Sequence, residues 1–187
     1  MRLSIRIRNI CFISVFTAII AVCAQISIPA PTGVPFTLQT FAVPLAGIIL
    51  GAKNGTLSVI IYIFLGILGV PVFTGFSGGF GVIFSPTGGF ILSFPVMSLC
   101  SGIFANISAD KKLPFKYFLI TAGLILGAVI NYIAGVLMFS MITSVNLHES
   151  LIVCVLPFII PDCVKIILCS TVGLNIRKIL VKNKILT

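Results

Sequence analysis

The chain has 187 residues, of which 59% are hydrophobic and only 8% are charged, and its mean hydropathy is +1.28. A soluble domain carries about 25% charged residues because its surface must meet water, so this composition excludes a soluble globular protein. The net charge of +9 does not indicate nucleic-acid binding, because the basic residues form short clusters between apolar runs instead of one patch. No polar linker divides the chain, so residues 1–187 are predicted to form a single transmembrane domain.

The apolar runs predict an all-α integral membrane protein with six membrane-spanning helices, because a helix needs roughly 20 residues to cross a ~30 Å apolar core. The second and third spans are short and flank a turn at Lys53-Asn54-Gly55, so we expect them to be tilted, to thin the bilayer locally or to form a re-entrant pair. Two full crossings are favoured, because Lys53 at the bilayer centre would be costly. In chain order the predicted spans are residues 9–28, 38–52, 56–70, 90–108, 117–142 and 151–176.

Two segments rich in proline and glycine separate these helices. Residues 28–37 contain three prolines and one glycine, which end the first helix. Residues 70–90 contain six glycines, two prolines and no charge, so they cannot form a regular helix throughout. Irregular backbone at membrane depth is tolerated only where protein buries it or where it lines a cavity. The two segments could form a lid over a pocket on one side of the membrane or be two simple turns. The absence of charge in so long a segment favours the pocket.

Six crossings place almost all basic residues on one side of the membrane. The positive-inside rule makes that side cytoplasmic, with both termini on it. Lys165 is the single cation that this topology leaves within a span. The eleven cytoplasmic residues are Arg2, Arg6, Arg8, Lys53, Lys111, Lys112, Lys116, Arg177, Lys178, Lys182 and Lys184.

Asp162 and Lys165 form the one acid–base pair inside an apolar span. At spacing i, i+3 they share a helix face, and unpaired burial of either would cost several kcal/mol. Two interpretations stay open: a salt bridge that only allows the helix to exist, and a functional site, which is the commoner role of intramembrane charges. Pro157 and Pro161 precede the pair and are expected to bend the helix toward a cavity.

Other residues are weaker candidates. Asn131 and Tyr132 lie in the middle of the fifth span and are predicted to bind either a ligand or a neighbouring helix. The glycine-rich segment lacks the Gly-Lys-Ser/Thr of a Walker A loop, and no pattern indicates a catalytic nucleophile or a metal cluster. Six phenylalanines are candidates for the flat walls of a pocket or for ordinary packing: Phe36, Phe41, Phe73, Phe76, Phe80 and Phe84.

Three stretches of this chain closely resemble the BioY family, the biotin-binding S components of energy-coupling factor (ECF) transporters. They are IPAPTGVPFTLQTFAVPLAGIILGAKNG (28–55), YIFLGILGVPVFTGFSGGFGVIFSPTGGF (62–90) and LPFIIPDCVKIIL (156–168). The resemblance implies six helices with both termini inside, high-affinity biotin uptake, and location in the cell membrane. It also implies partnership with a membrane coupling subunit and two ATPases, no cofactor, and no enzymatic activity.

The resemblance also implies which residues meet the ligand and the partner. Asp162 is expected to accept hydrogen bonds from the ureido N–H groups of biotin, and Lys165 to donate to the ureido carbonyl or to meet the carboxylate. The other expected ligand-binding residues are Thr37, Gln39, Phe73, Gly78, Gly79, Thr87, Gly88 and Tyr132. Small residues of the first helix, which form two small-xxx-small registers, are expected to contact the coupling subunit: Ser14, Thr17, Ala18 and Ala21.

Several alternatives remain at the level of sequence. The chain is also compatible with an S component for another small vitamin or precursor, and with a solitary biotin transporter. An intramembrane enzyme using Asp162 and Lys165 would need a further nucleophile or metal site. A passive structural or channel protein would leave the buried pair unexplained.

Overall fold

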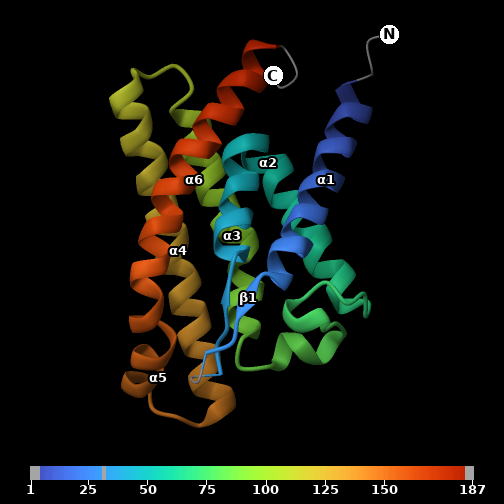
Figure 1. Cartoon of the computed structure of the whole chain (residues 1–187), viewed down its shortest axis with the longest axis vertical. Coiled ribbons are helices and arrows are strands. Elements are labelled where there is room, and N and C mark those ends of the chain that lie inside the picture. Colours follow the sequence, from blue (N-terminus) through green and yellow to red (C-terminus); the bar gives the residue numbers. More distant parts are fainter. Residues whose placement is uncertain (1–4, 31–32, 184–187) are drawn as a thin grey trace.

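The computed structural model describes residues 5–30 and 33–183 and is built almost entirely of helices (Figure 1). Five of the helices in these residues are long and apolar enough to cross a membrane: α1, α2, α3, α4 and α6. The prediction of an all-α membrane protein is confirmed. The helices are α1 (Ile5–Gln25), α2 (Gln39–Ile67), α3 (Gly88–Ile107), α4 (Leu113–Thr143), α5 (Leu147–Cys154) and α6 (Leu156–Lys182).

The helix α2 contains the predicted second and third spans, joined at a sharp break. Gly51 has φ 79° and ψ 171°, a conformation that is essentially restricted to glycine. Beyond it the chain folds back, so that a Cβ at Gly55 would lie 2.6 Å from the Cα of Gly47. The halves 39–50 and 52–67 run in opposite directions (Figure 1). The chain therefore passes through the molecule twice here, as predicted, although the break lies two residues before Lys53.

Arg177 of α6 stabilises the broken end of the first half of α2. Its guanidinium donates to the carbonyl oxygen of Ile48 at 2.8 Å and to Oδ1 of Asn106 at 2.7 Å. The carbonyl of Ile48 lies in the last turn of that half, where carbonyls lack partners within the helix. A cation at this position also complements the negative end of the helix dipole.

Small residues allow α2, α3 and α4 to pack closely side by side. A Cβ at Gly102 of α3 would lie 2.5 Å from the Cα of Ala52, and one at Gly127 of α4 would lie 3.2 Å from the Cα of Met97. Close backbone approach of this kind is how helices associate in a bilayer, where the hydrophobic effect between helices is absent.

The predicted sixth span is divided in the structure. A break at Val155 (φ −120°, ψ −54°) separates the short α5 from α6. Pro157 lies in the first turn of α6, where its missing N–H is harmless, and Pro161 lies inside the helix. The interruption therefore precedes both prolines.

The two ends of the molecule differ in character. The start of α1 and the end of α6 lie at the same end of the bundle, the upper one in Figure 1, together with the α3–α4 connection. This is the cytoplasmic end required by the charge pattern. The opposite, external end carries the two irregular segments.

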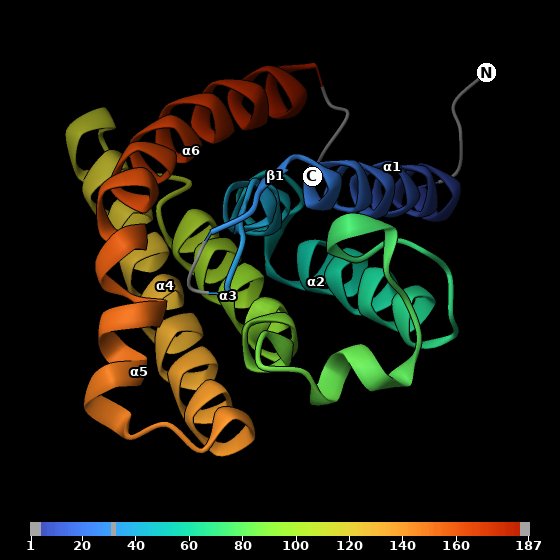
Figure 2. The ribbon, with the colours of Figure 1, turned by 60° about the horizontal axis from the view of Figure 1, so that its bottom comes forward.

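The external segments have little regular structure, as predicted for residues 70–90. They contain two short 3-10 helices, η1 (Thr74–Phe76) and η2 (Phe80–Phe84). Two strands of two residues each, β1 (Ser27–Ile28) and β2 (Phe36–Thr37), pair antiparallel between α1 and α2. The strand pair, which was not predicted, places Thr37 two residues before the first residue of α2. Figure 2 shows the strands beside the first half of α2, between α1, α3 and α6.

Candidate functional site

A cavity of about 210 Å³ lies at the external end of the bundle. Its walls come from the segment before α2, the start of α2, the η1 and η2 segments, the start of α3, the middle of α4 and the first half of α6. Residues more than 120 positions apart in the chain therefore face the same space.

Asp162 and Lys165 lie on the α6 wall of this cavity and form an ion pair. The distance from Lys165 Nζ to Asp162 Oδ1 is 2.9 Å, and the two side chains are only 11% and 13% exposed. The predicted pairing is confirmed. In the part of the chain that the structure describes, it is the sole salt bridge between side chains.

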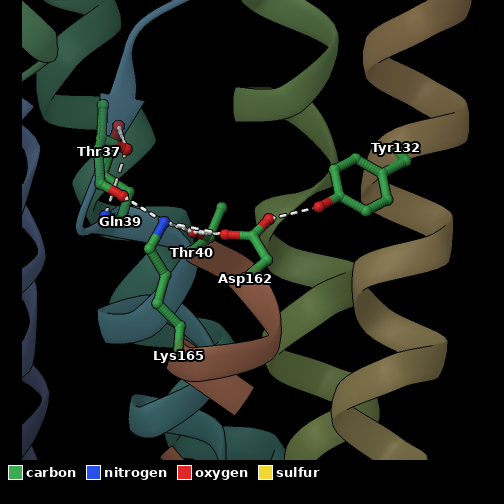
Figure 3. A network of polar contacts seen from close by, with 6 residues as sticks. All are labelled: Thr37, Gln39, Thr40, Tyr132, Asp162 and Lys165. Carbon is green, nitrogen blue, oxygen red and sulfur yellow. Dashed lines mark hydrogen bonds and ion pairs between the residues drawn. The ribbon is translucent and has the colours of Figure 1, made fainter. Parts of the chain in front are cut away.

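The hydrogen bonds of the Lys165 ammonium group are complete. Besides Asp162, it donates to the backbone carbonyl of Thr37 at 2.9 Å and to Oγ1 of Thr40 at 2.8 Å (Figure 3). An ammonium group has three donors and no acceptor. Lys165 therefore joins α6 to the start of α2 and has no unused proton in this state.

The carboxylate of Asp162 accepts from three different elements. Oδ1 accepts from Lys165 and from the Thr40 hydroxyl at 3.2 Å, and Oδ2 accepts from the Tyr132 hydroxyl at 2.5 Å. Figure 3 shows Tyr132 approaching from α4, on the side opposite to Lys165. A carboxylate has about four acceptor positions, so one remains for a ligand.

A second polar network surrounds Gln39, which is buried at the start of α2. Its Nε2 donates to the Tyr62 hydroxyl at 2.7 Å, and its Oε1 accepts from the hydroxyls of Thr37 and Thr74. Tyr62 donates in turn to the carbonyl of Val72 at 3.3 Å. Through Thr74, Gln39 thus links the η1 segment to the start of α2.

Asn131 supplies an acceptor with no partner within the described chain. Its amide nitrogen donates to the carbonyl of Phe90 at 3.0 Å and to Oγ of Ser93 at 2.7 Å. Because the Phe90 carbonyl can only accept, these bonds fix which end of the amide is nitrogen. Oδ1 is therefore left as a free acceptor on a residue that lines the cavity.

Seven of the ten predicted ligand-binding residues line this cavity. Phe73, Phe90, Phe94 and Phe158 supply apolar wall, in the mixture of apolar surface and few polar groups that small-molecule sites have. The ligand-binding role of the seven stays a prediction. They are Thr37, Gln39, Phe73, Thr87, Tyr132, Asp162 and Lys165.

Gly78, Gly79 and Gly88 are not among the lining residues. A Cβ at Gly78 would lie 2.5 Å from the carbonyl oxygen of Val70, and the N–H of Gly79 donates to the carbonyl of Gly66 at 2.7 Å. The N–H of Gly88 donates to the carbonyl of Ser85. These three glycines therefore shape the loop backbone and do not line the cavity.

Of the six phenylalanines considered as pocket walls, Phe73 lines the cavity and the other five do not. Phe73 is buried in the wall, whereas Phe76, Phe80 and Phe84 are 72%, 63% and 57% exposed. The other two are also outside the wall: Phe36 packs on Phe158, with ring centroids 4.3 Å apart, and Phe41 packs against the core.

Sequence reasoning missed Thr40 and Thr74 and left Asn131 undecided. Thr40 follows Gln39 by one residue, and nothing in a lone threonine distinguishes it from a core residue. Asn131, in contrast, is a polar residue in the middle of an apolar span, which was a usable signal.

The small residues of α1 divide between two faces. Ser14 and Ala18 are exposed, but Thr17 is buried and donates to the carbonyls of Ile13 at 2.9 Å and Ser58 at 3.0 Å. Ala21 is half-buried against the core. Thr17 therefore contacts α2 of its own chain, which contradicts its placement on an outward interface. The Ser14–Ala18 register stays available to a partner.

Comparisons with known proteins agree with this architecture. The family model described as "BioY family" matches residues 1–182. The "Probable biotin transporter BioY" of Pyrococcus horikoshii is 39% identical over 84% of this chain and 89% of the relative, and the "Biotin transporter BioY" of Thermotoga maritima is 36% identical over 90% and 95%.

A solved structure gives the same result. The crystal structure of the S-component for biotin from an ECF-type ABC transporter matches with a TM-score of 0.83 and 28% identity, covering 95% of each chain. The extent of these matches and the shared fold leave one assignment: the chain belongs to the BioY family.

Proposed function

We propose that this chain binds biotin in the external cavity and mediates its uptake as the S component of an ECF transporter. The observation that carries the proposal is the buried network of Asp162, Lys165, Tyr132 and Thr40, in which the two opposite charges neutralise each other in the wall of a cavity that also has apolar surface. Biotin matches such a site, because a ureido group with two N–H donors sits on an apolar fused ring.

The geometry favours one orientation of biotin. Two acceptors on residues that line the cavity have no partner within the described chain: the remaining position on Asp162 and Oδ1 of Asn131. Lys165 has used all three donors and is neutralised by Asp162. The ureido N–H groups therefore face Asp162 and Asn131. The carboxylate points to the loop side of the cavity, which Ser77 and Thr87 line.

Transport is proposed to require further subunits in the cell membrane: a membrane coupling subunit and two ATPases, bound in part through the exposed Ser14–Ala18 register of α1. Biotin is the cargo, and neither a cofactor nor a chemical step is invoked. The membrane character of the chain, its BioY family membership and its likeness to an ECF S-component support this division of labour.

Binding can be tested on the purified full chain in detergent by calorimetric titration with biotin. Asp162→Asn removes the carboxylate that accepts from a ureido N–H, and we expect an affinity loss of roughly 10- to 100-fold, because a hydrogen bond to a charged group contributes about 1.5–3 kcal/mol. Glu149→Gln is the matched control, since Glu149 lies in the exposed first turn of α5. Failure of the unmodified chain to bind below the micromolar range would refute the function, whereas equal binding by both variants would refute only the site.

A further inference from the structure

A second and larger cavity, of about 780 Å³, opens at the cytoplasmic end of the bundle. It lies where the break in α2, the connection between α3 and α4, and the last turns of α6 meet. No residue lines both this cavity and the external one.

The charge of this cytoplasmic cavity is entirely positive. Among the described residues no aspartate or glutamate lines it, and Asp110, which neighbours Lys111 in the chain, is not a lining residue. Six basic side chains therefore share one space without a carboxylate. They are Lys53, Lys111, Lys116, Arg177, Lys178 and Lys182.

Only two of these six cations have partners within the described chain. Arg177 donates to Ile48 and Asn106, and Lys116 donates to the carbonyl of Ala109 at 2.7 Å. Across residues 5–30 and 33–183, no hydrogen bond or ion pair involves the ammonium groups of the other four lysines. The positive-inside rule explains why basic residues lie on this side. It does not explain their convergence on one cavity, which Lys112 of the same loop does not line.

The same cavity also has an apolar lining. Leu50 and Leu174 are buried at 8% and 7% exposure, and Leu113, Tyr117 and Val181 contribute further apolar surface. Cationic groups and apolar side chains thus line one space at the cytoplasmic edge of the spans. Basic cavities between helices on this side are suited to anionic lipid headgroups.

From this combination we propose that the cytoplasmic cavity binds an anionic phospholipid of the inner leaflet. The phosphate meets the four unpaired lysines, and the acyl chains lie along the apolar lining. A free phosphate would satisfy the lysines and leave the apolar lining exposed. An acidic segment of another protein would also satisfy the charge, and the experiment below distinguishes it from a lipid.

Native mass spectrometry of the full chain in detergent tests the proposal with phosphatidylglycerol and with phosphatidylcholine of identical acyl chains. The variant Lys53→Gln/Lys178→Gln removes two lining cations. Its control, Arg6→Gln/Lys112→Gln, removes two cytoplasmic cations that do not line the cavity. Each lysine near an anionic lipid contributes about fivefold in affinity, so phosphatidylglycerol binding should weaken about 25-fold in the first variant. In the control it should change less than twofold.

Two further arms keep the result decisive. Lys111→Gln against Lys112→Gln repeats the comparison with single, neighbouring substitutions if a double variant fails to fold. Inorganic phosphate at the same concentration should not displace the lipid. Three results would overturn the lipid assignment. Phosphatidylglycerol binding could weaken equally in a variant and its control, phosphatidylcholine could bind as well as phosphatidylglycerol, or inorganic phosphate could displace the lipid. Unchanged lipid binding with loss of a co-purifying protein partner would assign the cavity to that partner and would overturn it too.

Discussion

At the scale of single residues, the external cavity depends on polar groups that hold one another in place. The carboxylate of Asp162 accepts hydrogen bonds from α4, α6 and the start of α2, so it links three helices. Such a network is costly to leave partly satisfied in a medium of low dielectric constant. A ligand that supplies the missing hydrogen bonds to Asp162 and Asn131 completes it.

Tyr132→Phe tests the α4 side of this network. The substitution removes the hydroxyl that donates to Asp162 Oδ2 and keeps the ring in the wall. Hydrogen bonds to charged groups contribute about 1.5–3 kcal/mol, so biotin affinity should fall roughly 10- to 100-fold in a titration. Tyr117→Phe, which lies by the cytoplasmic cavity, is the control and should bind like the unmodified chain. Equal affinities for the two variants would remove Tyr132 from the site.

The proposed orientation of biotin is tested from the ligand side. N-methylation of the ureido ring removes a donor that Asp162 or Asn131 would accept, and it should weaken binding roughly 10- to 100-fold. Converting the carboxylate to an amide changes the end that faces the loop and should cost less. Competition against radiolabelled biotin measures both analogues. If the amide proves the weaker ligand, the orientation is reversed.

At the scale of elements, the break in α2 decides how the chain reaches six passes with five long helices. The sequence predicted two short spans from the length of the apolar runs and from Lys53, and the structure confirms both. The sequence alone could not place the break at Gly51. Four glycines lie from residue 47 to residue 66, and only tertiary packing selects which one takes a positive φ. Arg177, 126 positions after Gly51, stabilises this break by donating to the carbonyl of Ile48.

Gly51→Ala should therefore destabilise the protein. The φ of 79° with ψ of 171° is strained for any residue with a Cβ, and the added atom would lie 3.2 Å from Asn106 Oδ1. A cost of about 1–3 kcal/mol is expected, seen as a lower melting temperature by circular dichroism in detergent. Gly81→Ala is the control, since a Cβ there meets nothing within 4 Å. Equal melting temperatures for the two would show that the break tolerates a side chain.

The same scale explains which site residues were predictable. The spacing of Asp162 and Lys165 on one helix is a local property, so the sequence was sufficient to predict their pairing. Thr40 and Thr74 join the site only because α6 and the η1 segment close over the start of α2. The glycine-rich segment was correctly predicted to be irregular. Its glycines shape the backbone around Gly66 and Val70, which no local pattern could indicate.

At the scale of the whole molecule, the two ends have opposite chemistry. The external end holds a neutralised ion pair in a small cavity, and the cytoplasmic end holds a larger cavity lined by six cations, four of which have no partner within the described chain. The glycine-rich segment lacks the Gly-Lys-Ser/Thr of a Walker A loop, and α1 leaves Ser14 and Ala18 exposed. A chain built this way can select a ligand outside, but the energy for releasing it inside is expected to come from a partner.

Biotin uptake at trace concentration should accordingly depend on the coupling subunit and the ATPases. Cells or proteoliposomes that contain this chain with those subunits should accumulate radiolabelled biotin, and the chain alone should bind it without accumulation. Ala18→Trp, on the exposed face of α1, should abolish accumulation and leave binding unchanged, because a bulky side chain prevents close approach of another helix. Ile19→Trp, at the neighbouring exposed position, is the control and should transport normally. Accumulation by the chain alone would instead establish a solitary transporter. Equal transport by the two tryptophan variants would move the partner interface away from the Ser14–Ala18 register.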